Sequence, residues 1–363
     1  MVVLLGLMAC CRDDTPDMGD LTAIAYQPES MTIAVPEGFQ EMPIPADNPM
    51  TLAGVELGRH LFFDPILSAD STMGCFSCHD PALSFTDGGA VSEGIDGVFG
   101  RRSAMSLLNV GFSTSGFLWD GAAESLEAQA ILPVEDPVEL HHTWPELEEK
   151  LQRHDRYPEM FRRAFGIENV SEIRQDLAVK AIAQFERTLV SSGNSKWDRF
   201  VRGEYEFTDE ENLGYQLFFD FENGLPDAEC GHCHNFPLFT INEDAFRNNG
   251  IEDISELTEF PDLGLGEVTG SPTDNGKFKI PTLRNVLLTA PYMHDGRFEN
   301  IDQVLEHYNR GGHVQPNTDP LMEPQNLEPI HLDALKSFLE TLTDEDFLNN
   351  PEFLSPLAKA NGN

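Results

Sequence analysis

Two short segments of the chain share one spacing of cysteines and a histidine. At residues 75–79 and again at 230–234, two cysteines are separated by two residues, and a histidine directly follows the second cysteine. This spacing is typical of the covalent attachment of c-type haem. Cysteines three residues apart lie on one helical turn, so both can form thioethers with the same porphyrin edge, and the next residue can reach the iron. The sequence therefore predicts two covalent haem c groups, one held by Cys75, Cys78 and His79 and the other by Cys230, Cys233 and His234.

Three other uses of paired cysteines compete with haem attachment. A tetrahedral zinc site needs four ligands at one point, and a thioredoxin-like redox motif needs a β-α-β context. The four thiols could also pair as disulfides. None of these alternatives accounts for a histidine after both cysteine pairs, so haem attachment is the favoured interpretation.

The acidic balance of the chain restricts its partners. The sequence has 62 acidic and 23 basic residues, which gives a formal net charge of −39. Nucleic-acid binding needs lysine and arginine to neutralise phosphates, so it is excluded, and an anionic membrane surface is disfavoured for the same reason. A basic protein partner suits this charge.

The N-terminus predicts export. Its apolar stretch ends in Leu7-Met8-Ala9-Cys10, which resembles a bacterial lipoprotein signal, although no lysine or arginine precedes it. We expect residues 1–33 to be a signal and polar tether on a periplasmic, lipid-anchored protein that contacts the membrane only through this anchor. A cleaved signal without a lipid and a misassigned start codon are the alternatives. No apolar run reaches the 18 or so residues that a membrane-spanning helix needs.

Helical periodicity dominates the rest of the chain. Apolar residues recur at steps of three and four, which predicts helices over 125–132, 145–165, 170–191, 208–219, 301–308 and 330–343. Gly, Pro, Asp and Ser are frequent in 84–102 and 242–277, which predicts loops, and no paired alternating strands stand out. A Leu-Phe-Phe-Asp sequence precedes each cysteine motif, at 61–64 and 217–220, as a weak internal duplication. We expect a mostly α fold of two cytochrome c-like haem domains with long irregular loops, residues 34–190 and 191–345, followed by a tail at 346–363.

Further motifs give the chain a family resemblance from about Pro49 to Thr343. The motifs are Leu57-Gly58-Arg59, Leu61 to Asp64, Cys75 to His79, Trp119-Asp120-Gly121, Cys230 to His234, Pro281 to Asn285 and Pro291 to Gly296. In this order they resemble the bacterial di-haem cytochrome c peroxidase and MauG family. The resemblance implies that the first haem binds hydrogen peroxide and that the second transfers electrons. The electrons would come from a small redox protein or from a protein substrate oxidised at its side chains; an ordinary cytochrome c peroxidase and a non-catalytic di-haem electron carrier are the alternatives.

The resemblance also implies the iron ligands. His79 would be the proximal ligand of the first iron, and no histidine occurs between His79 and His141, so the first iron would be open as in the MauG branch. His234 would bind the second iron. Peroxidases of the family add a methionine there and the MauG branch adds a tyrosine, which corresponds to Tyr308, with Met293 and His307 as competing ligands.

Other residue roles follow from the same resemblance. Gln129, Pro133 and Glu139 would lie above the open iron, with Glu139 as the acid-base group and Glu135 as the alternative. Trp119 would bridge the two haems. Arg102 and Arg284 would pair with haem propionates, or alternatively form surface ion pairs. A calcium ion between the haems would use Thr289 and Pro291 carbonyls and Ser103, which stands where the family has Asn, so a hydroxyl or a water would have to serve.

Overall fold

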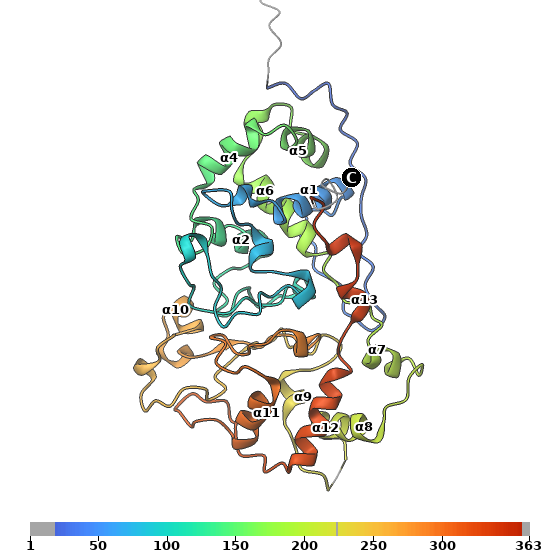
Figure 1. Ribbon diagram of the computed structural model, residues 1–363, viewed down its shortest axis with the longest axis vertical. Coiled ribbons are helices and arrows are strands. Elements are labelled where there is room, and N and C mark those ends of the chain that lie inside the picture. Colours follow the sequence, from blue (N-terminus) through green and yellow to red (C-terminus); the bar gives the residue numbers. More distant parts are fainter. Residues whose placement is uncertain (1–18, 223, 358–363) are drawn as a thin grey trace, which may run out of the picture.

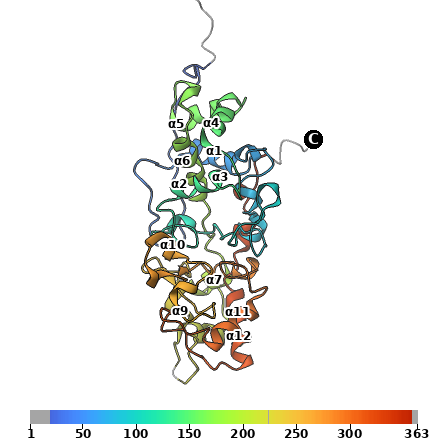
Figure 2. The same ribbon diagram turned by 90° about the vertical axis from the view of Figure 1, so that its left-hand side faces the viewer.

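The protein is described by a computed structural model that covers residues 19–222 and 224–357. Its elongated shape consists of two largely helical halves stacked end to end, as Figures 1 and 2 show. The predicted Cys10 anchor lies outside the described residues. No helix in the described part of the chain combines the length and hydropathy needed to cross a bilayer.

The first half is built from short and medium helices joined by long irregular segments. They are α1 (Leu52–Phe62), α2 (Leu126–Gln129), α3 (Leu132–Glu135), α4 (Trp144–Arg153), α5 (Tyr157–Phe165) and α6 (Gln175–Glu186).

The second half has the same character. It contains α7 (Lys196–Val201), α8 (Asp209–Phe219), α9 (Cys230–Cys233), α10 (Leu265–Thr269), α11 (Ile301–Arg310) and α12 (Pro329–Glu340), and α13 (Glu345–Leu348) follows. The strands β1 (Phe246–Arg247) and β2 (Phe278–Lys279) form one short antiparallel pair. The predicted mostly α fold is confirmed.

Three of the predicted helices differ from the structure. The predicted helix 125–132 is interrupted, because α2 ends at Gln129 and α3 begins only at Leu132. The predicted helix 145–165 is two helices, because α4 ends at Arg153 and α5 begins only at Tyr157, with Pro158 in its first turn. The predicted helix 170–191 extends only from Gln175 to Glu186, and Val170–Glu172 form a separate 3-10 turn before it. Helix α1 was not predicted; its apolar face is interrupted by Gly58, whose role becomes clear only from its packing.

The weak sequence duplication corresponds to a repeated helix pair. Helix α1 packs against α6 in the first half, and α8 packs against α12 in the second. A Cβ atom on Gly58 would lie 1.8 Å from the carbonyl oxygen of Ala181, and one on Gly214 would lie 2.0 Å from that of Ala334. Each pair thus crosses at a glycine that precedes Leu-Phe-Phe-Asp, because only a residue without a side chain allows such close approach.

The end of the chain returns to the first half, where α13 lies beside the junction in Figure 1. Phe347 and Phe353 are buried in an aromatic cluster with Phe62 and Phe85. The Arg59 guanidinium donates to the carbonyl oxygen of Pro351 at 2.7 Å. Residues that follow the predicted second domain in sequence therefore stabilise the first half, while the exact domain boundaries stay a prediction.

Candidate functional site

The first cysteine motif forms a tight turn that presents His79 to a cavity. Cys75–Ser77 make a 3-10 turn, and the His79 Nδ1 lies 2.8 Å from the carbonyl oxygen of Phe85. Burial lowers the pKa of His79, so the ring is neutral and Nδ1 carries the donated proton. This leaves Nε2 free of a proton, as an iron ligand requires.

The second motif repeats this arrangement on α9. The His234 Nδ1 lies 3.2 Å from the carbonyl oxygen of Phe239, and burial lowers the pKa of His234 to about 4. Both histidines are therefore oriented by a backbone carbonyl a few residues downstream. A hydrogen bond to the other ring nitrogen is the usual way in which a protein fixes a metal-binding histidine.

One cavity of about 820 Å³ receives both motifs and most of the predicted site residues. Cys75, Cys78, Cys230 and Cys233 are free thiols, so no disulfide joins them. Among the described residues, the one group of side chains close enough to share a metal ion is Asp220, Glu229 and His232, which contains no cysteine. Cys78 and His79 of the first motif and Cys230, Cys233 and His234 of the second line the cavity. Thiols beside a neutral histidine in both motifs fit two haem groups. The cavity is also lined by Arg102, Ser103, Trp119, Gln129, Pro133, Glu135, Glu139, Thr289, Pro291, Met293 and Tyr308.

Glu139 has the electrostatic properties of an acid-base group. Its side chain is exposed and lines the cavity, and desolvation by the protein atoms around it raises the pKa of its carboxyl to about 7. The nearby negative charge of Asp136 raises this pKa further. The carboxyl also influences the thiols of Cys75 and Cys78, which places it beside the first motif. A carboxyl that titrates near neutrality can both accept and return a proton.

The two halves share a second repeated feature besides the helix pairs, and it shows which residue of the second half corresponds to Pro133. Phe117 forms a backbone bridge with Ala123 in the first half, and Tyr292 forms the same bridge with Phe298 in the second. A short helix with a polar N-cap follows each bridge, at Ser125 and at Asn300. At the spacing that aligns these features, Trp119 corresponds to His294 and Pro133 corresponds to Tyr308. The second half thus has a potential iron ligand where the first half has a proline, which has no ligating group.

Trp119 lies at the junction of the halves. Its indole Nε1 donates to the carbonyl oxygen of Ser103 at 2.9 Å, and its own carbonyl oxygen accepts from the Lys279 amide of β2 at 2.8 Å. The following Gly121 has a φ of +75°, and a Cβ there would lie 2.7 Å from the Phe246 ring of the other half. The Trp-Asp-Gly motif therefore has a geometric reason: the turn needs a glycine at the contact between the halves.

Tyr308 and Met293 meet at one side chain, Asn249. The Asn249 Nδ2 lies 3.3 Å from the Tyr308 Oη and 3.3 Å from the Met293 Sδ. Burial raises the pKa of Tyr308 to about 12, and the hydrogen bond from Asn249 acts in the opposite direction. His307 has another role, because its Nε2 lies 2.9 Å from the Asn249 carbonyl oxygen and must donate to it. A protonated Nε2 cannot bind iron, so the competition remains between Tyr308 and Met293.

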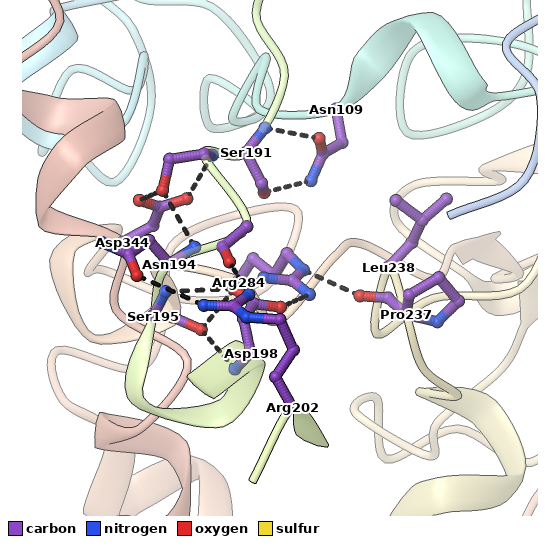
Figure 3. A network of polar contacts seen from close by, with 12 residues as sticks. Asn109, Ser191, Asn194, Ser195, Asp198, Arg202, Pro237, Leu238, Arg284 and Asp344 are labelled. Carbon is purple, nitrogen blue, oxygen red and sulfur yellow. Dashed lines mark hydrogen bonds and ion pairs between the residues drawn. The ribbon is translucent and has the colours of Figure 1, made fainter. Parts of the chain in front are cut away.

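The two predicted propionate partners are held by carboxylates. Arg102, which lines the cavity, is bound by Asp120 and Asp262. Arg284 is buried outside the cavity lining, where Asp198 accepts from both of its terminal nitrogens, at 2.8 and 3.0 Å, and Pro237 accepts from Nε, as Figure 3 shows. Neither arginine is a surface residue. Their pairing with propionates stays a prediction, for which Arg102 has the suitable position.

The predicted calcium donors are neutral oxygens. The Ser103 hydroxyl donates to the carbonyl oxygen of Met293 at 2.9 Å, and its amide donates to that of His294 at 2.7 Å. Ser103 thereby connects the two halves directly, and its oxygen keeps lone pairs. With the carbonyls of Thr289 and Pro291 it supplies fewer than the six to eight oxygens that calcium prefers. Calcium binding therefore stays a prediction that needs several waters.

Sequence reasoning missed two ionisable side chains: Lys279, which lines the cavity, and Glu186, whose charge acts on the Cys75 thiol. The Lys279 Nζ donates to the hydroxyls of Ser113 and Ser115 at 3.0 and 2.7 Å, and burial lowers its pKa to about 8. Glu186 of α6 is 3% exposed, its pKa is raised to about 8 by burial, and its Oε2 has no hydrogen-bond partner in the described structure. Lys279 lies two residues before the motif Pro281 to Asn285, whereas nothing in the sequence distinguishes Glu186 from surface glutamates.

The comparisons with known proteins agree with this geometry. A family model described as di-haem cytochrome c peroxidase matches residues 52–206. The chain is 35% identical over 308 residues to the methylamine utilization protein MauG of Methylorubrum extorquens, covering 84% of this chain and 82% of that protein. It is 33% identical over 322 residues to the cytochrome c551 peroxidase of Nitrosomonas europaea, covering 88% of each.

Solved structures show the same fold. The crystal structure of a MauG-like protein associated with microbial copper homeostasis superposes with a TM-score of 0.81 at 31% identity, covering 90% of this chain and all of that one. The di-haem peroxidase BthA from Burkholderia thailandensis, with a TM-score of 0.69 at 22% identity, shares the fold. Two cysteine-histidine motifs facing one cavity, and relatives aligned over most of their length, lead to one conclusion: the chain belongs to the di-haem cytochrome c peroxidase family of oxidoreductases.

Proposed function

We propose that the chain is a MauG-type peroxidase, in which hydrogen peroxide is reduced at the haem of the first motif and Tyr308 is the second protein ligand of the other haem. The observation that carries this proposal is the contrast between Pro133 and Tyr308 at equivalent positions of the two halves. Pro133 lines the cavity in the half that contains His79 and has no ligating group, whereas the phenol of Tyr308 lines the cavity in the half that contains His234.

The histidines support an open first site. Among the described residues that line the cavity, the histidines are His79, His234 and His294. The His294 ring stacks on Phe278 with centroids 3.6 Å apart, on the side of the second half. His142, which follows the first motif in sequence, is buried elsewhere and its Nδ1 accepts from the Thr143 amide.

Haem, when bound to the two motifs, supplies the iron that reacts with peroxide and a second redox centre. The residues of the chain supply proton transfer and orientation. The Glu139 carboxylate accepts a proton from peroxide and returns it to the departing oxygen, which a pKa of about 7 permits at neutral pH. Gln129 lines the same space and can orient peroxide by hydrogen bonding. Trp119 lies where an electron passing between the halves would travel.

The second candidate is an ordinary cytochrome c peroxidase, and Met293 favours it. Its Sδ is as close to Asn249 as the Tyr308 Oη is, so a thioether ligand has access to the same part of the cavity. A thioether stabilises ferrous iron and raises the reduction potential, whereas a phenolate favours ferric iron.

Near-infrared absorption of the purified, haem-loaded ferric protein separates the two candidates. We expect no sulfur-to-iron band in the wild type and a high-spin signal for one haem in its electron paramagnetic resonance spectrum. Tyr308→Met should introduce the band and raise the potential of the second haem. A sulfur-to-iron band in the wild type would instead assign the chain to the methionine-ligated peroxidases.

The electron donor is proposed from charge. A net charge of −39 supports a basic partner, either a small cytochrome or copper protein or a protein oxidised at its side chains. Peroxide consumption should accelerate when a reduced basic cytochrome is added at low salt, and the acceleration should fall as salt is raised. Consumption that is equal with and without any donor protein would contradict this partner class.

Export with a lipid anchor is also part of the proposal. It is supported by the cysteine motifs, since c-type haem is attached after export, and by the N-terminal sequence. Cell fractionation should recover the haem-loaded chain in the periplasmic membrane fraction, and Cys10→Ala should release it to the soluble periplasm. A wild-type chain found soluble in the cytoplasm would overturn this localisation.

A further inference from the structure

The loop at residues 248–250 is fixed by hydrogen bonds that do not involve the cavity. The Asn248 side chain is 1% exposed and donates to the Gln315 Oε1 at 2.8 Å and to the Asn317 Oδ1 at 2.9 Å. Gly250 has a φ of +64°, and its carbonyl oxygen accepts from the His313 amide at 2.7 Å. The residue between these two anchors, Asn249, therefore has a backbone position that does not depend on a ligand.

Helix α11 is connected to this loop through two consecutive residues. His307 donates from Nε2 to the Asn249 carbonyl oxygen at 2.9 Å, and Tyr308 accepts from the Asn249 Nδ2 at 3.3 Å. One asparagine thus determines the position of the phenol oxygen in the cavity, through its backbone carbonyl and through its side-chain amide. The His307 contact fixes the helix, and the amide contact fixes the phenol.

The orientation of the Asn249 amide follows from the chemistry of its second neighbour. A thioether sulfur can only accept a hydrogen bond, so the group 3.3 Å from the Met293 Sδ must be the NH₂ and not the carbonyl oxygen. The same NH₂ then offers its second proton to the Tyr308 Oη. Asn249 is therefore a donor to both candidate ligands of the second haem and holds both in place.

We propose that Asn249 is a positioning residue that tunes the second haem, by donating one N–H to the phenolate oxygen of Tyr308 and the other to the sulfur of Met293. This inference rests on the proposed ligation by Tyr308. A hydrogen bond to an anionic ligand withdraws charge from it and weakens its donation to ferric iron, so the amide raises the reduction potential that the phenolate alone would give. The second N–H donates to the Met293 sulfur, which engages a lone pair that could otherwise bind iron.

A double-mutant cycle on the haem-loaded protein tests this role. Asn249→Leu keeps a similar side-chain volume and removes the donor, and Asn249→Ala removes it without adding bulk. In the wild-type background, both should shift the redox equilibrium of the second haem about tenfold toward the ferric form, which is a potential lower by about 59 mV for a one-electron couple. In the Tyr308→Met background, where the acceptor is a neutral thioether and not an anionic phenolate, Asn249→Leu should shift the potential much less.

Asn212→Leu provides the matched control, because it makes the same substitution on α8 at a residue that does not line the cavity. Its potential should equal that of the wild type. A purely structural role for Asn249 would change the potential equally with and without Tyr308, and that result overturns the proposal. The ligation of the wild type is read first from its near-infrared spectrum: a sulfur-to-iron band overturns both the Tyr308 ligation and this inference, whereas no band together with an unchanged potential in Asn249→Leu overturns the role of Asn249 alone.

Discussion

The protonation states and orientations of single side chains at the cavity depend on the protein that surrounds them. Most glutamates of so acidic a chain are solvated, yet Glu139 has a pKa raised to about 7 because the protein around the cavity excludes water. His79 and His234 are neutral for the same reason, and each is oriented by a phenylalanine carbonyl. The electrostatic environment of the cavity thus gives common residues the states that haem chemistry requires.

The prediction at this scale concerns Glu139→Gln. Peroxide cleavage should slow about a hundred- to ten-thousand-fold while both haems remain bound, because the amide cannot shuttle a proton. In the wild type the rate should rise with pH through about 7, since the carboxyl must be deprotonated to accept the proton, and the variant should lack this rise. Stopped-flow mixing with peroxide across pH measures both effects.

Glu135→Gln is the matched control, because Glu135 lines the same cavity three residues after Leu132 on α3. It should react at nearly the wild-type rate. A slow Glu135→Gln variant beside a fast Glu139→Gln variant would transfer the acid-base role to Glu135.

At the scale of elements, the fold repeats one arrangement in both halves. A helix ending in Leu-Phe-Phe crosses a second helix at a glycine, a cysteine motif follows, and a bridged turn leads into a short capped helix. The turns contact the opposite half: a Cβ on Gly121 would meet Phe246, and one on Gly296 would lie 2.3 Å from Ala90. The two halves therefore share one backbone arrangement. They differ in the side chains at corresponding positions, such as Pro133 in the first half and Tyr308 in the second, and our proposal assigns different roles to the halves on this basis.

The helix crossing makes a prediction about Gly58→Ala. The added methyl group would lie 1.8 Å from the Ala181 carbonyl oxygen, so α1 and α6 must separate. Overpacking of this kind costs about 1–3 kcal/mol, and the better helix propensity of alanine returns up to about 1 kcal/mol. We expect a net decrease in the free energy of unfolding, measured by urea denaturation.

The control for this substitution is Gly100→Ala, where the nearest atom to the new Cβ is the Ser92 carbonyl oxygen at 3.6 Å. That distance is ordinary van der Waals contact, and stability should change by less than about 0.5 kcal/mol. Equal stability of the Gly58→Ala and wild-type proteins would show that the helices do not cross as described.

At the scale of the whole molecule, the two halves are joined around the cavity by polar contacts. Arg102 of the first half binds Asp262 of the second, and Lys279 of the second binds Ser113 and Ser115 of the first. The chain end returns to the first half through Phe347 and Phe353. These contacts bring the two cysteine motifs, 155 residues apart in the sequence, to the same cavity.

The corresponding prediction is the haem content of the whole chain. Intact-mass measurement of matured protein should show two covalent haems, and the Cys75→Ser, Cys78→Ser double variant should show one. The equivalent change at Cys230 and Cys233 should also leave one, because each motif attaches its haem independently. A matured wild-type chain carrying one haem or none would contradict the role of the motifs.

The mostly α fold and the family could be predicted from the sequence, and the haem-attachment residues stay a prediction from it, because each depends on short-range spacing. Two cysteines and a histidine within five residues specify an attachment geometry on one helical turn, and steps of three and four specify a helix face. The ends of the helices were less predictable. A turn at residues 154–156 separates α4 from α5, and the spacing of apolar residues does not reveal it.

Contacts between residues far apart in the sequence could not be predicted from local patterns. Asn249, Met293 and Tyr308 come from a loop, a turn and a helix, and no periodicity or motif connects them. The Asn249 carbonyl also removed His307 from the candidate ligands, and the crossing of α1 with α6 explained Gly58. Contacts of this kind depend on how whole helices and loops pack. Many weak interactions across the core set their relative positions, and a local sequence pattern does not contain this information.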